Sequence, residues 1–296
     1  MKNNLENSLL KELCDDGIWR ISNVMKSVLQ YQISRMDKRE VNEDETRYPK
    51  SQAGMRSFLK KFFTRHYLQA QSSLVHYMSS NDFINILKSG SLTILDIGSG
   101  PAVTSLAITD MLTYIIEHLQ NIGKWSKGRL VKINYILNDT SEICLGTGQY
   151  MIKDYFRRKR IKEISCSHMF RIQKDFPNNI NLLRRIRYNL GTYDIVIFSY
   201  VLTPLIEDKI FNQLINGFLE IKNLCNQRGR ILILQDKFQR NLIQRVSRSI
   251  GVSSHKEESH QYIYPKRNDN DTYKYSYYSC LYEPKKQMNK SLKIVA

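Results

Sequence analysis

From residue 92 onward the chain alternates short apolar runs with longer segments of helical periodicity. The apolar runs span residues 92–97, 133–137, 168–173, 194–198 and 231–235. The helical segments between them lie near residues 103–120, 142–160, 180–189 and 207–226. This alternation predicts a parallel sheet covered by helices. Two more strand-like runs, 260–264 and 273–282, flank a polar turn and predict an antiparallel hairpin at the end of the sheet.

The first 88 residues follow a different pattern. Apolar residues recur near a 3.6-residue period from Ile18 to Ile33 and again from Phe58 to Leu68, with no strand-like alternation. A third short helix fits Asp82–Leu87 and ends before Gly90. A length of 296 residues suggests about two structural units. We therefore expect a helical extension over residues 1–88 and an α/β domain over residues 89–296.

Composition excludes several classes of protein. An apolar content of 42 % and a total of 29 Tyr and Phe residues argue against a disordered chain. The longest apolar stretch, 195–206, is shorter than the roughly 20 residues of a membrane-spanning helix. The N-terminal residues carry acids and no apolar run, so no secretory signal is expected. Five scattered cysteines, with no CxxC and no closely spaced histidines, predict a reduced, cytoplasmic protein without a metal site.

The charge is strongly positive and clustered. A net charge of +17 favours a polyanionic partner such as RNA. Residues 153–187 hold eleven Lys or Arg against three acids. The residues predicted to contact nucleic acid are Arg157, Arg158, Lys159, Arg160, Lys60, Lys61 and Arg65. The alternative is a basic, solvated surface that reflects an AT-biased genome.

The most informative motif is LTILDIGSGPA at residues 92–102, where a strand runs directly into Gly98-Ser99-Gly100. Glycines at a strand-to-helix turn let the backbone approach a ligand closely. The dinucleotide motif GxGxxG is not met, because Val103 stands at the third glycine position, and no GxxxxGK[ST] phosphate loop occurs. Asp96 would repel a pyrophosphate, so the turn suits a cationic ligand.

This motif resembles the first motif of class I S-adenosylmethionine (SAM)-dependent methyltransferases, and the resemblance extends over residues 90–283. It implies a Rossmann-like fold with a mostly parallel seven-stranded sheet, and SAM as the cofactor. In that family the acid lies near the methionine amino group and the glycine backbone contacts the ligand. By position these residues are Asp96, Gly98, Ser99 and Gly100.

The resemblance assigns further cofactor positions to the ends of three other predicted strands. Asp139, followed by Thr140, would hold the ribose hydroxyls. Asp175 and Phe176 would contact the adenine amino group and ring, although Asp175 also fits a solvated loop acid. Ser199 would lie near the methyl group.

Two residues are candidates for catalysis. Tyr200 follows the fourth strand, where the substrate would stack or donate a hydrogen bond. His66 lies on the basic helix that we expect to cover the cofactor pocket, although a histidine there also suits packing.

The sequence leaves the acceptor atom open. The chain lacks the [DN]PP[YF] motif of exocyclic-amine methyltransferases and the Pro-Cys pair of cytosine C5 enzymes, and no complete Lys-Asp-Lys-Glu set is found. The run SYVLTPL also resembles a methyltransferase-like family linked to small ribosomal subunit assembly, whose members read SYVLxEL there. We predict a methyltransferase of structured RNA, rRNA or tRNA, with a ribosomal subunit as one partner. The alternatives are a catalytically silent assembly factor and a methyltransferase of small molecules or proteins.

Overall fold

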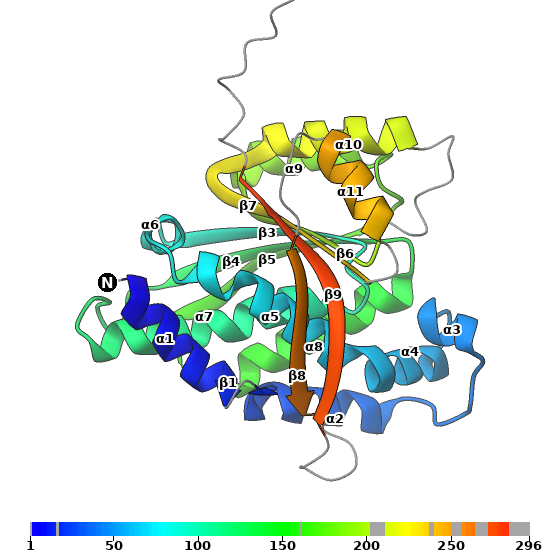
Figure 1. Cartoon of the computed structure of the whole chain (residues 1–296), viewed down its shortest axis with the longest axis horizontal. Coiled ribbons are helices and arrows are strands. Elements are labelled where there is room, and N and C mark those ends of the chain that lie inside the picture. The colour runs from blue at the N-terminus through cyan, green and yellow to red at the C-terminus, as the bar shows by residue number, and fades with distance from the viewer. Residues whose placement is uncertain are drawn as a thin grey trace, which may run out of the picture.

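The structure, a computed structural model, describes residues 2–15, 18–159, 161–201, 211–236, 240–249, 256–263 and 272–283. In the described part of the chain, a twisted sheet separates two layers of helices (Figure 1). One layer holds α9, α10 and α11, and the other holds α7 and α8 together with the helices of the N-terminal extension.

The described strands form one nine-stranded sheet in the order β1-β2-β8-β9-β7-β6-β3-β4-β5. Their bounds are β1 (Cys14–Asp15), β2 (Ile18–Trp19), β3 (Ser91–Ile97), β4 (Val131–Asp139), β5 (Ile164–Gln173), β6 (Tyr193–Ser199), β7 (Cys225–Asp236), β8 (Lys256–Ile263) and β9 (Thr272–Tyr282). Strands β5, β4, β3, β6 and β7 are parallel, and β9 is antiparallel to both β7 and β8. The expected parallel sheet with a C-terminal antiparallel hairpin is confirmed. The predicted sheet had seven strands, and the short strands β1 and β2 extend it to nine among the described residues.

The helices cover the two faces of this sheet. Their bounds are α1 (Lys2–Leu13), α2 (Asn23–Arg35), α3 (Glu43–Arg47), α4 (Gln52–Phe58), the π-helix η1 (Leu59–Phe63), α5 (Thr64–Met78), α6 (Asn81–Lys88), α7 (Val103–Asn121), α8 (Glu142–Arg158), α9 (Ile180–Leu190), α10 (Phe211–Leu224) and α11 (Arg240–Ser249). Four of them follow the predicted helical segments at 103–120, 142–160, 180–189 and 207–226. Residues 202–210, the start of the last of these segments, lie outside the described residues.

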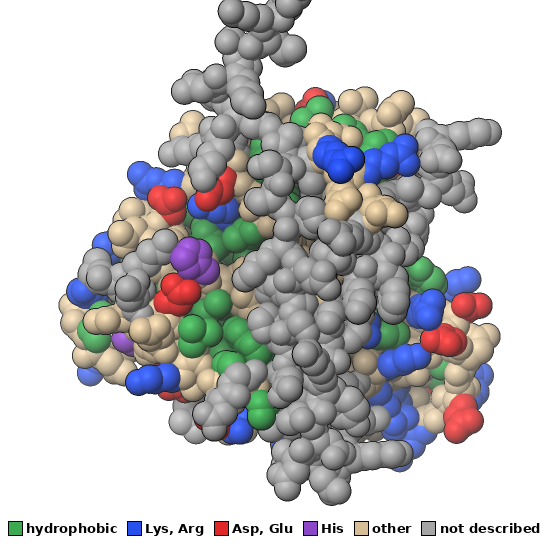
Figure 2. Space-filling view, viewed as in Figure 1, with side chains coloured by type: hydrophobic (Ala, Val, Ile, Leu, Met, Phe, Trp, Pro, Cys, Tyr) green, Lys and Arg blue, Asp and Glu red, His purple; other side chains and the backbone are tan. Residues whose placement is uncertain are grey.

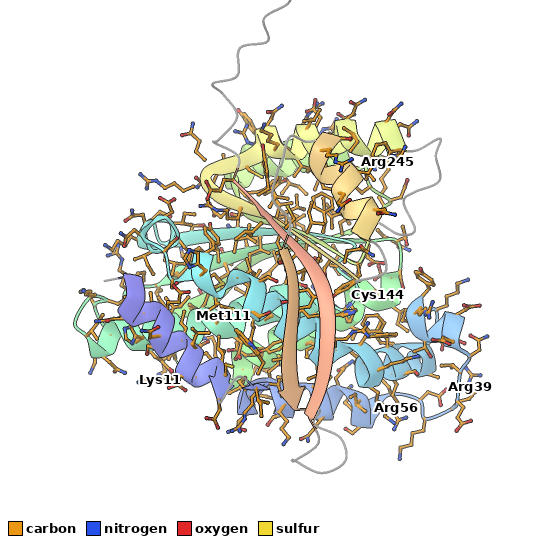
Figure 3. The ribbon with its side chains drawn as sticks, viewed as in Figure 1. Lys11, Arg39, Arg56, Met111, Cys144 and Arg245 are labelled. Carbon is orange, nitrogen blue, oxygen red and sulfur yellow. The ribbon has the colours of Figure 1, made fainter. Side chains whose placement is uncertain are left out.

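The central strands are buried on both faces, which explains their continuous apolar runs. Residues Leu92–Ile97 of β3 and Tyr193–Phe198 of β6 are all buried. Parallel strands covered by helices on both sides require such runs instead of alternation. The core therefore forms two hydrophobic clusters, one on each face of the sheet (Figure 3, where Met111 and Cys144 mark one of them).

The N-terminal extension is mainly helical, as predicted, but it also contains the two short strands β1 and β2, which the sequence analysis did not predict. Strand β2 pairs in parallel with β8, so the hairpin bridges the sheet and the extension. Buried side chains of α1, α2 and α5 belong to the same hydrophobic cluster as those of α7. The division at residue 88 stays a prediction. Among the described residues, no helix combines the length and apolar character needed to cross a bilayer.

Candidate cofactor-binding site

The carboxyl ends of three neighbouring strands meet beside the glycine turn. Ile97 of β3 is in register with Asn138 of β4 and with Phe198 of β6. The next residues along these strands are Gly98, Asp139 and Ser199, so they share one row at the edge of the sheet. Ligands of open α/β sheets bind outside the carboxyl ends of the strands. The structure thus brings together residues that are separated by up to 101 positions in the sequence.

Asp96 is a buried carboxyl group with a free acceptor atom. Its side chain is 1 % exposed, and Oδ2 accepts a hydrogen bond of 2.7 Å from Ser105 Oγ on α7. Oδ1 is buried and has no hydrogen-bond partner among the described residues. Burial raises the pKa of Asp96 to about 7, the Ser105 hydrogen bonds oppose this rise, and the neighbouring Asp139 adds to it. A cation at Oδ1 would satisfy the atom and favour the charged carboxylate.

The glycine turn holds a conformation that most residues avoid. Gly98 has φ +65°, and a Cβ placed on it would lie 2.3 Å from Cγ2 of Val201. Gly100 has φ +51° and open space where a Cβ would point. Helix α8 packs closely against the end of this turn: a Cβ added to Gly148 of α8 would lie only 2.9 Å from the Cβ of Ala102. The backbone is therefore fixed on one side and accessible at Gly100.

Asp139 connects the end of β4 to the glycine turn. Its Oδ2 accepts a 2.8 Å hydrogen bond from the Gly100 N–H, and its Oδ1 accepts one of 2.9 Å from the Ser141 N–H. Burial raises the pKa of Asp139, while these backbone donors and that of Thr140 oppose the rise. Each carboxylate oxygen keeps a second lone pair for a ligand hydroxyl. Thr140 is exposed beside it.

The end of β5 does not present both of its predicted residues to a ligand. Asp175 is exposed and accepts a 2.5 Å hydrogen bond from Asn178. Phe176 is 3 % exposed, with its ring centroid 5.3 Å from that of Phe198 and 6.0 Å from that of Phe218. Its ring surface is thus covered by the core, and we leave Phe176 out of the cofactor site.

The two residues predicted to act in catalysis lie against each other. The rings of His66 and Tyr200 stack with centroids 3.9 Å apart and planes 15° apart. The Tyr200 hydroxyl donates a hydrogen bond to Oε1 of Gln69, one turn further along α5. Burial lowers the pKa of His66 well below its usual range, and the adjacent Arg65 lowers it further. His66 is therefore neutral, and its Nε2 lies 3.3 Å from Arg65 Nη2.

The backbone at Tyr200 is strained. Its φ of +59° is in the left-handed region, which costs a residue with a side chain about 1–2 kcal/mol. A hydrogen bond of 2.9 Å from the Tyr200 N–H to the Leu234 carbonyl and the stack on His66 hold it there. Ser199, directly before it, accepts a 3.2 Å hydrogen bond from Thr104 on α7. Such strain persists mainly where the side chain must be aimed at a particular place.

Sequence reasoning missed the residues that support these groups. Gln69, Ser105 and Val201 each contact a predicted site residue. Gln69 and Ser105 belong to no recognisable motif, and Val201 lies in the SYVLTPL run, which gave no sign of its contact with Gly98. The π-helix η1 was also missed. Such bulges occur frequently at functional sites, and η1 precedes the turn that carries His66.

The predicted nucleic-acid contacts fall into two places. Arg157, Arg158 and Lys159 end α8, which starts beside Asp139 and runs back about 25 Å. They therefore lie at the opposite edge of the sheet from the glycine turn. Arg158 is paired with Asp154, and Lys159 donates to the Ile161 carbonyl. Arg160 lies outside the described residues.

The second basic group is close to the candidate site. Lys60 and Lys61 are in η1, and Lys61 pairs with Glu43 at 3.1 Å. The guanidinium of Arg65 lies 5.0 Å from the ring centroid of Phe62, beside His66. On this side of the molecule, Figure 2 shows Lys and Arg side chains interspersed with acids around α3 and α4. Arg39 and Arg56 mark this area in Figure 3.

Comparisons with known proteins assign no family to this chain. No protein-family model matches the sequence, and no curated protein matches it. Three similar solved structures are a precorrin-6Y C5,15-methyltransferase from Geobacter metallireducens, an rRNA methylase from Streptococcus thermophilus and the plantazolicin methyltransferase BpumL in complex with SAH.

These likenesses are distant. The identities are 10 %, 13 % and 16 %, and the TM-scores are 0.40, 0.34 and 0.34 in the same order. The alignments cover 69 %, 66 % and 85 % of this chain and 89 %, 87 % and 68 % of the three structures. At these values they decide neither activity nor substrate. The assignment of a class I methyltransferase fold rests on the strand order and directions described above.

Proposed function

We propose that this chain is a SAM-dependent methyltransferase that acts on structured RNA. The observation that carries the proposal is the row formed by Gly98, Asp139 and Ser199, with the buried Asp96 beneath it. Two carboxyl groups and a glycine turn at one strand edge suit a cationic ligand that also carries hydroxyls. SAM has both features, since it holds an ammonium, a sulfonium and a ribose.

The residues present fit this cofactor. Asp96 offers a buried acceptor without a partner among the described residues, which an ammonium group would satisfy. The turn leads into the N-terminus of α7, where the positive end of the helix dipole favours a carboxylate. Asp139 can accept from two neighbouring hydroxyls. When bound, SAM supplies an electrophilic methyl group on its sulfonium.

The other residues of the site would position the substrate. Methyl transfer is an in-line displacement, so holding the nucleophile near the methyl group accounts for much of the catalysis. Tyr200 has a fixed ring orientation, because His66 stacks on it and Gln69 accepts from its hydroxyl. The neutral His66 ring therefore acts as a positioning residue that holds the Tyr200 ring in place. Val201 packs against the Gly98 side of the turn.

RNA is the substrate class favoured by the charge. The chain carries a net charge of +17, and Lys153, Arg157 and Arg158 are exposed on α8. Phosphate contacts position a nucleic acid without reading its sequence. Because these residues lie at the edge opposite the glycine turn, the RNA would have to span the molecule. A structured RNA has the dimensions to do so, whereas a small molecule does not.

A catalytically silent RNA-binding factor is the second candidate. The Tyr200 hydroxyl, the polar group expected closest to the substrate, is already bonded to Gln69, and the Tyr200 ring is covered on one face by His66. If this arrangement persists with RNA bound, the protein would bind SAM and RNA without turnover.

Transfer of label from methyl-tritiated SAM to total cellular RNA tests the proposal. We expect label in RNA that becomes soluble after nuclease treatment, and its loss in the Asp139→Ala variant. Binding of SAM and RNA without label would support the silent factor. Label in protein or small molecules instead of RNA would refute the RNA substrate.

A further inference from the structure

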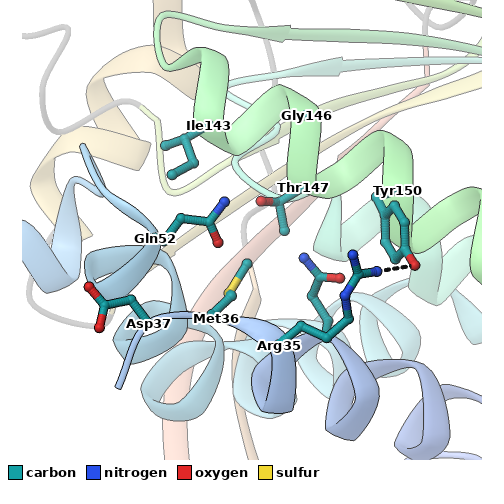
Figure 4. A pocket seen from close by; sticks show the side chains of 9 residues that line it. Arg35, Met36, Asp37, Gln52, Ile143, Gly146, Thr147 and Tyr150 are labelled. Carbon is teal, nitrogen blue, oxygen red and sulfur yellow. Dashed lines mark hydrogen bonds between the residues drawn. The ribbon is translucent and has the colours of Figure 1, made fainter. Parts of the chain in front are cut away.

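A groove lies between the N-terminal extension and α8, on the side of α8 away from the sheet (Figure 4). Its volume is about 500 Å³, and side chains of α2, α4 and α8 line it. They include Gln32, Arg35, Gln52, Thr147 and Tyr150. Six of the nine lining residues carry polar or charged side chains, so the groove differs from an unfilled gap in the hydrophobic core.

Two tyrosines and two arginines form a cluster at the end of this groove. The rings of Tyr31 and Tyr150 are nearly parallel, with centroids 6.5 Å apart and planes 22° apart. The guanidinium carbon of Arg35 lies 5.3 Å and 5.0 Å from these two centroids, and Nη1 donates to the Tyr150 hydroxyl (Figure 4). The guanidinium of Arg158 lies 5.1 Å from the Tyr31 ring. We call these four residues the Tyr-Arg cluster.

The cluster is open to solvent. Tyr31 is 40 % exposed although it is a large aromatic residue, and Arg35 and Arg158 are exposed as well. Lys153 and Arg157 are exposed on the same helix as Tyr150. Two acids, Asp37 in the groove and Asp154 beside the cluster, reduce the positive charge. Asp154 is paired with Arg158, and Asp37 lies 3.9 Å from Arg39.

The groove also offers groups that could read a base edge. Oε1 of Gln32 is buried and has no hydrogen-bond partner among the described residues, which is costly unless a ligand donates to it. Gln52 and Thr147 add amide and hydroxyl groups to the lining. An exocyclic amino group of a base is a suitable donor for the Gln32 acceptor.

We propose that this groove and the Tyr-Arg cluster bind a single-stranded segment of RNA. Aromatic faces beside guanidinium groups suit unpaired bases, which stack on them regardless of sequence. In a duplex these base faces are hidden, so an unpaired loop or end is the ligand favoured. An acidic peptide would use the arginines but leave the tyrosine faces and the Gln32 acceptor unused. The inference rests on the proposed function for its choice of RNA, and adds where the RNA is held.

The test is fluorescence anisotropy of the full chain with a labelled 12-nucleotide single-stranded RNA of mixed sequence. We expect Tyr31→Ala to weaken binding by about tenfold, because loss of one stacking contact costs roughly 1–3 kcal/mol. Arg35→Lys, which keeps the charge but loses the planar guanidinium, should also weaken binding. A duplex of the same length should bind less tightly than the single strand.

Matched controls come from the other face of the sheet. Tyr188, 90 % exposed, and the exposed Arg185 lie on α9. Tyr188→Ala and Arg185→Lys should change the affinity less than twofold. Tyr31 and Tyr188 are both exposed, so neither truncation to Ala should unfold the protein. Thermal melting of each variant checks this.

Several results would overturn the proposal. One is an equal loss of affinity in the groove variants (Tyr31→Ala, Arg35→Lys) and in the control variants on α9. Another is unchanged RNA binding in both groove variants. A third is a poly-glutamate peptide that displaces the labelled RNA as effectively as unlabelled RNA does. SAM binding, measured by calorimetry on the same variants, separates this proposal from the proposed function. Weakened RNA binding with unchanged SAM affinity in Tyr31→Ala and Arg35→Lys would support the groove. A wild-type protein that binds the RNA but does not bind SAM would count against the proposed function and leave the groove standing.

Discussion

The pH dependence of SAM affinity offers a sharp test of the role of Asp96. Its carboxyl group has a pKa of about 7 because it is buried, so it is largely protonated below neutral pH. A cationic ligand needs the charged carboxylate, and its binding should therefore release a proton. From pH 8 to pH 5 the charged fraction falls from about 90 % to about 1 %. Affinity should drop by about 90-fold, or about 2.7 kcal/mol.

Isothermal titration calorimetry between pH 5 and pH 8 would measure this slope. Asp96→Asn should bind SAM weakly and with no pH dependence over this range. Asp194→Asn is a matched control. Burial also raises the pKa of Asp194, to about 6, but its carboxylate accepts hydrogen bonds from the Thr93 N–H and from Asn226, away from the glycine turn. That variant should keep the slope. An affinity that is flat with pH in the wild-type protein, or the same slope in Asp96→Asn, would refute the reasoning.

Three further predictions concern stability and the turn. Because burial raises the pKa of Asp96, its contribution to the stability of the ligand-free protein falls by about 4 kcal/mol as the pH rises from about 4 to 7. Asp96→Asn should therefore melt at a higher temperature than the wild type at pH 8, and a lower melting temperature would contradict this. Asp110 accepts hydrogen bonds from three buried or half-buried hydroxyls, and Asp110→Ala should lower the free energy of unfolding in urea by about 3 kcal/mol; a loss below about 1 kcal/mol would show that the cluster is dispensable. Gly98→Ala should lower SAM affinity at least about tenfold, since its Cβ would collide with Val201. Gly128 also has a positive φ but has open space around it, so Gly128→Ala should leave SAM affinity unchanged. Calorimetric titration of both variants with SAM measures the two affinities.

The sequence predicted the parts of the fold that follow from local pattern. A run such as LTILDI, apolar on both faces and followed by glycines, identifies a buried strand and its turn. Asp139 and Ser199 were placed at strand ends for the same reason, and the register brings both beside Gly98. The apolar pattern identified the last residue of each strand, and the parallel strand order brings these ends together, because the carboxyl ends of parallel strands meet at one edge of the sheet.

Contacts between distant elements left no such signal. The stack of His66 on Tyr200 joins residues 134 positions apart, and no periodicity announces it. Phe176 is ambiguous in the sequence, because an aromatic residue after a strand-end acid is compatible with both a ligand contact and core packing, and in the structure it is buried. The space beside it is set by Gly217 of α10, where a Cβ would lie 2.8 Å from the Phe176 ring.

The two-residue strands of the extension were also invisible to pattern. Cys14–Asp15 and Ile18–Trp19 are too short to show alternation, and they become strands only because β8 offers an edge on which β2 can pair. Their pairing adds a sheet contact to the side-chain packing through which the extension and the α/β domain share one core.

Calorimetric titration of the full chain with SAM tests the central claim most directly. The proposed site predicts one binding site per chain at pH 7.5, with affinity reduced at least about fivefold in both Asp96→Ala and Asp139→Ala, since each removes a charge-assisted hydrogen bond. No binding by the wild-type protein, or full affinity in both variants, would contradict the assignment of the glycine turn as a cofactor site.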